Sequence, residues 1–123
     1  MPLLLASGMK IVIDHLGRVW RGDCPDGVAF RTMVSAVATG RVWIKASGPH
    51  RVGSAVEILR LLAEEVGDER LVWASDCPFV GEESRVTYQE TIDWLKDALP
   101  NPETQRKVMS ANAMALYGFN DVG

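Results

Sequence analysis

Apolar and polar positions form two alternating patterns along the chain. Three short runs are almost continuously apolar and end in polar residues: 10–15 (KIVIDH), 42–47 (VWIKAS) and 71–76 (LVWASD). Strands that are buried on both faces of a parallel sheet have this character. The runs begin at residues 10, 42 and 71, a spacing of 32 and then 29 residues, which suits a strand followed by a crossover helix. We therefore expect three parallel strands, adjacent in chain order, with right-handed helical crossovers.

The segments between and after these runs have the periodicity of amphipathic helices. Apolar residues recur at helical spacing over 30–37, 55–66 and 88–99. The second and third of these helices are preceded by sequences typical of a capping box, at 54–57 (SAVE) and 87–90 (TYQE). We therefore expect both helices to begin with a side-chain cap.

A fourth helix is predicted near the end of the chain. Asn101 suits its N-cap and Pro102 its first helical position. We expect it to end before Gly118, with a candidate break near Asn112. The predicted order is then β-α-β-α-β-α-α, and regular alternation of this kind indicates an α/β fold.

Composition narrows the classes of function. The 123 residues include 13 Lys and Arg against 16 Asp and Glu, and their net charge of −3 argues against a nucleic-acid binder. Neither G-x-x-x-x-G-K-[ST] nor G-x-G-x-x-G is present, so a nucleotide-binding module fits poorly. Cys24 and Cys77 form no C-x-x-C pair. The first residues do not resemble a secretory signal and no apolar run is long enough for a membrane span, so we expect a cytoplasmic protein.

Ionisable residues collect at the carboxyl ends of the predicted strands. The pairs DH at 14–15 and SD at 75–76 end the first and third runs, and HR at 50–51 follows the second. Active sites of parallel α/β folds form at this edge of the sheet. Strand ends are also where chains become polar, so a turn or a solvated role is an equal alternative for any one of these residues.

The alternation of side chains along a strand suggests where two of these groups point. His15 has the parity of Ile13, and Asp76 has that of Val72 and Ala74. The small Val72 and Ala74 suit the narrow interior of a barrel. We therefore expect His15 and Asp76 to point into one shared interior mouth.

Four segments resemble successive blocks of one protein family. They are 12–18 (VIDHLGR), 42–51 (VWIKASGPHR), 71–78 (LVWASDCP) and 116–119 (LYGF). The family is the amidohydrolase-related one that includes 2-pyrone-4,6-dicarboxylate lactonase, and the similarity runs over nearly the whole chain. It implies an α/β fold that is the C-terminal part of a (β/α)₈ TIM barrel. Residues 1–123 would then be a partial barrel domain, made of the last three strands and the closing helices.

The resemblance also implies roles for individual residues. His15 matches a strand-end histidine that contributes to a metal or metal-like site. Asp76 matches the aspartate that acts as general base on the hydrolytic water and, in metal-bound members, as a ligand. Arg51 matches an arginine that binds a substrate carboxylate. Lys45 and Ser47 are further candidates for substrate binding, and Lys45 either points into the barrel or reaches its rim.

The chain departs from the family pattern in ways that concern the site. The family's Asp-Trp-Pro-His is Asp-Cys-Pro-Phe at 76–79, which removes a Trp and a His, and its closing Asn-Pro is Asn-Ala at 112–113. The H-x-H of the family's first strand is absent, because His15 and His50 are the two histidines of the chain. A full barrel takes about 250 residues, so we expect the first five strands to be missing.

The expected function is therefore that of a hydrolase acting on a lactone or a related small molecule with a carboxylate, by water attack with Asp76 as general base. The alternative is a non-catalytic fragment that is inactive without the missing part. A cut barrel exposes strand edges, so an N-terminal complementing chain or a homo-oligomer is expected as partner, besides the substrate. We expect no nucleic acid and no membrane. Related full-length proteins would use a divalent metal, such as zinc, whereas His15 and Asp76 alone would bind one weakly or not at all.

Overall fold

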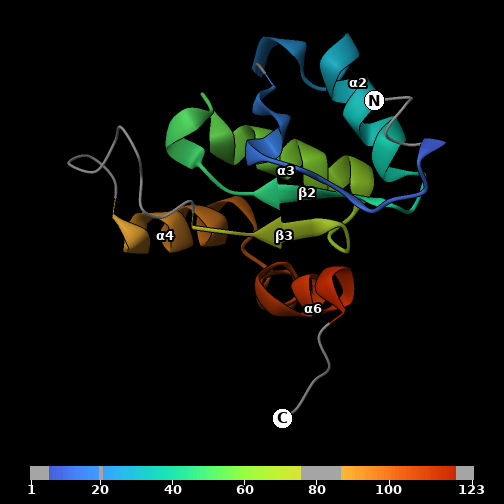
Figure 1. The fold of residues 1–123 in the computed structure, drawn as a ribbon. Coiled ribbons are helices and arrows are strands. Elements are labelled where there is room, and N and C mark those ends of the chain that lie inside the picture. The colour runs from blue at the N-terminus through green and yellow to red at the C-terminus, as the bar shows by residue number, and fades with distance from the viewer. Residues whose placement is uncertain (1–5, 20, 76–86, 119–123) are drawn as a thin grey trace.

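A computed structural model of the chain describes residues 6–19, 21–75 and 87–118. Three strands form one parallel sheet in the order β1-β2-β3 (Figure 1). They are β1 (Ile11–Ile13), β2 (Val42–Ala46) and β3 (Leu71–Trp73). The predicted order and parallel direction are confirmed, and each strand ends before the polar residues that close its run. The carboxyl ends of the strands therefore meet at one edge of the sheet.

Helices connect and follow the strands as the periodicity predicted. They are α2 (Val28–Val37), α3 (Ala55–Val66), α4 (Tyr88–Ala98), α5 (Pro102–Arg106) and α6 (Asn112–Tyr117). Short 3₁₀ turns lie in the loops, at η1 (His15–Arg18), η2 (Arg21–Asp23) and η3 (Pro49–Arg51). The predicted break near Asn112 is a π-helical turn, η4 (Lys107–Ala111), which joins α5 to α6 without leaving helical backbone angles.

One of the two expected capping boxes is present. The Glu90 amide donates to Thr87 Oγ1 at 3.2 Å, and the Glu90 carboxylate accepts from the Thr87 amide at 3.5 Å. The expected box at Ser54 is wrong, because Ser54 lies in the left-handed region (φ 56°, ψ 39°) and makes no side-chain cap. A capping oxygen needs an extended backbone to face the first amides of the helix. Asn101 caps α5 as predicted.

One face of the sheet packs against the helices. Val42 and Ile44 of β2 and Leu71 of β3 are completely buried there, together with Ile58 and Leu62 of α3. Figure 1 shows α2 and α3 on this side of the sheet. This main core also takes in residues of α4 and Val108 of η4. Alternation along the strands thus assigns the odd residues of β1 and β3 and the even residues of β2 to the helix-covered face.

The opposite face, which we call the inner face, has a separate and smaller cluster. Trp43, Val72 and Leu116 are buried in it, and Val12 and Ala113 pack against them. Leu116 and Ala113 come from α6, which lies on the side of the sheet away from α3 (Figure 1). In a closed barrel this face would line the interior.

Hydrogen bonds attach the closing helices to the loop that precedes β3. The buried Asn112 side chain donates to the carbonyl of Leu71 at 2.8 Å and to that of Asp68. Thr104 of α5 donates to the Asp68 carboxylate at 3.0 Å. Residues far apart in the sequence are thereby held together at the amino end of β3.

We predict that Asn112→Ala destabilises the chain, because two backbone carbonyls lose their donor. A loss of about 1–3 kcal/mol in the free energy of unfolding is expected for groups left unsatisfied in this way. Urea denaturation followed by circular dichroism measures it. Ser110→Ala, at an exposed position of η4, is the matched control and should change stability by less than about 0.5 kcal/mol. Equal stability of the two variants would contradict the role of Asn112.

Candidate functional site

The chain turns sharply where β1 ends. Asp14 keeps an extended backbone, and His15 and Leu16 then take positive φ angles of 47° and 54°, which non-glycine residues rarely adopt. Both side chains are buried, with 8% of His15 and none of Leu16 exposed. The turn therefore carries His15 out of the strand direction and toward the end of β2.

His15 and Ser47, two predicted site residues, are brought into contact by this turn. A buried hydrogen bond of 2.8 Å joins His15 Nδ1 to Ser47 Oγ, and Ser47 is 1% exposed. Gly48, with φ 57°, lies directly beneath the imidazole. A Cβ atom at that position would be 2.6 Å from His15 Nδ1, so a larger residue would displace the ring.

Asp14 and Lys45 form an ion pair beside this hydrogen bond. Lys45 Nζ lies 2.8 Å from Asp14 Oδ1, and both side chains remain partly exposed. The register pairs Ile13 with Ile44, which places the next residues of the two strands side by side. The hydrogen bond from Lys45 holds the pKa of Asp14 below its ordinary value, and the positive charges of Lys45, His15 and Arg18 add to this effect. Lys45 thus starts on the inner face and places its ammonium at the rim of the sheet.

The alternation of side chains led us to expect that His15 and Asp76 point into one shared interior mouth. The premise, that Ile13 and Val72 lie on the same face of the sheet, is wrong. Ile13 packs into the helix-covered core, whereas Val72 belongs to the inner face with Trp43, so the two residue sets do not share a face. Residue size was a poor guide, because the large Trp43 is also an inner-face residue. His15 leaves the alternation altogether, since its positive φ ends the strand geometry.

Two of the predicted residues cannot be placed in this arrangement. Asp76 lies outside the described residues, and Arg51 is described as part of the backbone of η3 but not in its side chain. Their assigned roles stay predictions. Sequence reasoning gave no role to Asp14 or Gly48, and only the strand register and the approach of the imidazole single them out.

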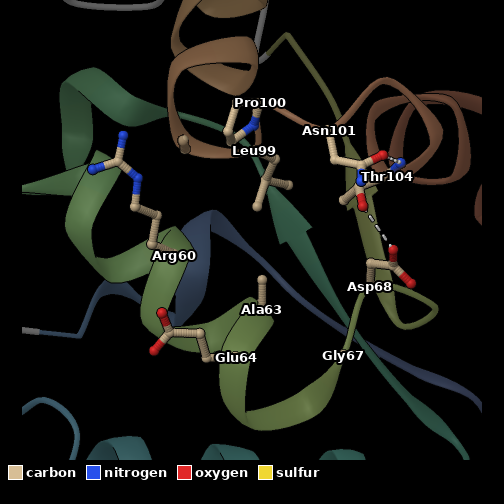
Figure 2. Close-up of a pocket in the computed structure, with 10 residues that line it drawn as sticks. Arg60, Ala63, Glu64, Gly67, Asp68, Leu99, Pro100, Asn101 and Thr104 are labelled. Carbon is tan, nitrogen blue, oxygen red and sulfur yellow. Dashed lines mark hydrogen bonds between the residues drawn. The ribbon is translucent and has the colours of Figure 1, made fainter.

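A cavity of about 590 Å³ lies elsewhere, among the outer helices. Figure 2 shows Arg60 and Glu64 of α3 on one side of it and Leu99, Pro100 and Asn101 on the other. The cavity also borders the loop that leads into β3, and therefore the amino end of that strand. It is separate from the groups at the carboxyl ends of the strands, and we assign it no part in the predicted site.

Metal binding needs more ligands than the described part of the chain offers. Among residues 6–19, 21–75 and 87–118, no group of three or more His, Cys, Asp or Glu side chains is arranged to hold a metal ion. His15 Nδ1 is engaged by Ser47 Oγ. These residues by themselves do not fit the three-ligand set that is common at catalytic zinc. In the same described ranges, no helix is long and apolar enough to cross a membrane.

Parallel β/α units with ionisable groups at the carboxyl edge of the sheet are the arrangement found in part of a TIM barrel. The sequence matches the profile of the amidohydrolase family over residues 5–119, and the chain belongs to that family. It is 27% identical over 117 residues to the 4-sulfomuconolactone hydrolase of Hydrogenophaga intermedia. That match covers 87% of this chain and 38% of the relative, so the chain spans less than half of the length of that protein.

Solved structures give the same family and the same partial coverage. A protein from Pseudomonas putida assigned as a 2-pyrone-4,6-dicarboxylic acid hydrolase is 30% identical, with a TM-score of 0.81 over 98% of this chain and 49% of its own. Another with this assignment, from Acinetobacter baumannii with bound citric acid, is 27% identical, with a TM-score of 0.82 over 96% and 47%. The predicted family and barrel fold are confirmed.

Divalent metals occur among more distant relatives. An amidohydrolase from Burkholderia multivorans, 16% identical with a TM-score of 0.74, contains zinc, and a dihydroxybenzoic acid decarboxylase from Polaromonas, 21% identical with a TM-score of 0.62, contains manganese. The chain covers 46% and 36% of these proteins.

We predict that the Asp14–Lys45 pair stabilises the chain in a pH-dependent way. Because the folded pKa of Asp14 is lowered, the contribution is present above the ordinary carboxyl pKa of 3.8 and is lost as pH falls through the lowered value. Both groups are partly exposed, so at most about 1 kcal/mol is expected. Titration of the Asp14 carboxyl carbon by NMR should give a pKa below 3.8 that rises in Lys45→Met but not in Lys96→Met. An ordinary pKa in the unmodified chain would refute the pair.

We also predict that the chain alone binds zinc weakly or not at all. The residues assigned to the metal are His15 and Asp76, and two ligands are fewer than a catalytic zinc site commonly has. Isothermal titration calorimetry with zinc tests this, with His50→Ala as the control for incidental binding by the other histidine. Tight stoichiometric binding that disappears in His15→Ala and survives in His50→Ala would show that the site has been misread.

Proposed function

We propose that this chain supplies the last three strands of a barrel that hydrolyses a lactone or a related small molecule bearing a carboxylate. The observation that carries the proposal is the arrangement at the carboxyl ends of β1 and β2. There the His15–Ser47 hydrogen bond and the Asp14–Lys45 ion pair lie side by side, at the edge where barrel enzymes carry out their chemistry. β3 runs toward this same edge, and Asp76 follows it by three residues.

The similarity to lactone hydrolases supports the class of reaction. The 4-sulfomuconolactone hydrolase acts, by its name, on a cyclic ester, and two structural relatives are assigned to a pyrone dicarboxylate. These substrates share an ester carbonyl and at least one anionic group. Lys45, whose ammonium pairs with Asp14, lies at the rim, and Arg51 follows β2 in the loop beyond it, so the cationic residues proposed to bind such an anion belong to one edge of the sheet.

In the proposed reaction, Asp76 takes a proton from a water molecule while the water oxygen attacks the ester carbonyl carbon. The bond between that carbon and the ring oxygen breaks, and the proton passes to the departing oxygen, which leaves a hydroxy acid. Arg51 binds the substrate carboxylate, and Lys45 and Ser47 contribute to its positioning. His15, held by Ser47, belongs to the metal or metal-like site. A divalent metal, when bound in the complete barrel, would polarise the carbonyl or the water.

The alternative is a chain without catalytic activity. The chain spans 38% of the length of its hydrolase relative, and its two histidines form no H-x-H, so the segment alone lacks that family motif. We therefore propose activity only for a complex with an N-terminal complementing chain. Activity that appears on mixing and is absent from either component alone would distinguish the two possibilities.

Asp76→Asn is the central test of the proposal. General-base catalysis contributes about 10²–10⁴-fold in rate, so kcat for lactone hydrolysis by the complemented complex should fall by about that factor. The fold should persist, because an amide keeps similar hydrogen bonds. Asp93→Asn on the exposed face of α4 is the matched control and should leave kcat unchanged. Arg51→Ala should instead raise KM. Turnover of Asp76→Asn near the unmodified level would remove the catalytic assignment.

A further inference from the structure

The hydrogen bond between His15 and Ser47 can form in two ways. A hydroxyl has one O–H donor and two lone pairs, and a neutral imidazole has one N–H donor and one unprotonated acceptor nitrogen. Either His15 Nδ1–H donates to Ser47 Oγ, or the Ser47 hydroxyl donates to an unprotonated Nδ1, across the same 2.8 Å. The choice fixes which nitrogen of His15 carries the ring proton, and therefore what the other nitrogen can do.

The surroundings of Ser47 decide between the two directions. In the part of the chain that the structure describes, His15 Nδ1 is the one hydrogen-bond partner of Ser47 Oγ. Ser47 is 1% exposed, so this chain by itself shields the hydroxyl from bulk water. If Oγ accepted the bond, its own O–H would be buried without an acceptor. An unpaired buried donor is costlier and rarer than an unfilled lone pair, so the Ser47 hydroxyl is the donor.

The imidazole is held in the orientation that this bond needs. Gly48 lies directly beneath the ring, where a Cβ atom would come within 2.6 Å of His15 Nδ1 and 3.1 Å of Cε1. His15 itself is 8% exposed. A flip of the ring about its bond to Cβ would exchange Nδ1 for Cδ2 and leave the Ser47 hydroxyl facing a carbon. Contact between Nδ1 and Ser47 is therefore the arrangement that pairs the buried hydroxyl.

We propose that Ser47 is a positioning residue that donates its hydroxyl proton to His15 Nδ1 and thereby keeps the ring proton on Nε2. His15 then offers an N–H to an acceptor atom, and its Nε2 has no lone pair for a cation. A metal-binding histidine normally has the reverse arrangement, in which the nitrogen away from the metal is the donor. The described residues also form no group of three metal ligands.

This assignment deepens the proposed function, on which it rests for the place of His15 in the reaction. It gives His15 the metal-like role of a hydrogen-bond donor. Because Ser47 is buried and engaged by the imidazole, it contributes to substrate positioning through His15 and not by direct contact. The direction of the hydrogen bond itself rests on the contacts and burial of these two residues alone.

The experiment is long-range ¹H–¹⁵N correlation NMR of the full, ¹⁵N-labelled chain at a pH of about 8.5, where imidazole groups are neutral. Protonated and unprotonated ring nitrogens have well-separated ¹⁵N shifts, and His50→Ala assigns the signals, because the chain has two histidines. We expect the Nε2–H form of His15, with a Ser47 hydroxyl proton that exchanges slowly with water. The Nδ1–H form in the unmodified chain would overturn the proposal. No hydrolysis is measured, so this result is independent of whether the complemented barrel is active.

Variants at Ser47 separate the hydrogen bond from packing. Ser47→Ala removes the hydroxyl, so the His15 Nδ1 resonance should move downfield, as expected when an acceptor nitrogen loses its donor, and the Nδ1–H form should become detectable. Ser47→Thr keeps a hydroxyl and should retain the Nε2–H form. Ser35→Ala, at an exposed position of α2, is the matched control and should leave both ring nitrogens unchanged.

A substitution that prevents folding does not remove the test. If Ser47→Ala does not fold, Ser47→Cys takes its place, because a thiol is a weak donor of similar shape. It should move the His15 Nδ1 resonance in the same direction by a smaller amount. An Nδ1 resonance that stays where it is in the unmodified chain, after the hydroxyl has been removed or replaced by the thiol, would overturn the assignment of Ser47 as donor.

Discussion

The register between β1 and β2 is the constraint on which the other features of this chain depend. Pairing Ile11 with Val42 and Ile13 with Ile44 sets the amino ends of the two strands level, and β2 continues past the end of β1 to Ala46. At the carboxyl ends this brings Asp14 beside Lys45 and lets the turn after β1 reach Ser47. A slip of one residue would move every side chain of a strand to the other face and would separate all of these groups.

The two faces of the sheet differ in how extensive a core the described residues build on them and in how well their polar groups are paired. The helix-covered face has a continuous core with many fully buried side chains. The inner face has one small cluster, assembled from the middle of the strands and two residues of α6. At the same face a buried indole N–H has no described acceptor and two cations rest on its ring. This asymmetry is what a segment of a larger barrel shows, because its inner layer is normally completed by strands from the rest of the domain.

The site has a corresponding asymmetry. Hydrogen bonds and an ion pair fix the groups on β1 and β2, and the glycine at position 48 is required by the approach of the imidazole. The relatives that share these units are about twice as long, and their names concern lactones and carboxylated rings. The described residues therefore hold a defined set of polar groups at the carboxyl edge of the sheet, and in the proposed function any further ligands would come from the remaining strands of the barrel.

Periodicity and motif order in the sequence by themselves determined the three parallel strands, the helices between them and the family, because buried strands and amphipathic helices have distinct local patterns. Local signals were less reliable where the backbone leaves its usual region, as at Ser54, whose capping motif has no cap. Residue size was a poor guide to the face of the sheet on which a strand residue lies. Both faces are buried, so the strands lack the polar alternation that would mark the inner face. Only the tertiary structure decided that His15 turns back onto Ser47 and that Lys45 pairs with Asp14, because both contacts depend on strand register and on one positive φ angle.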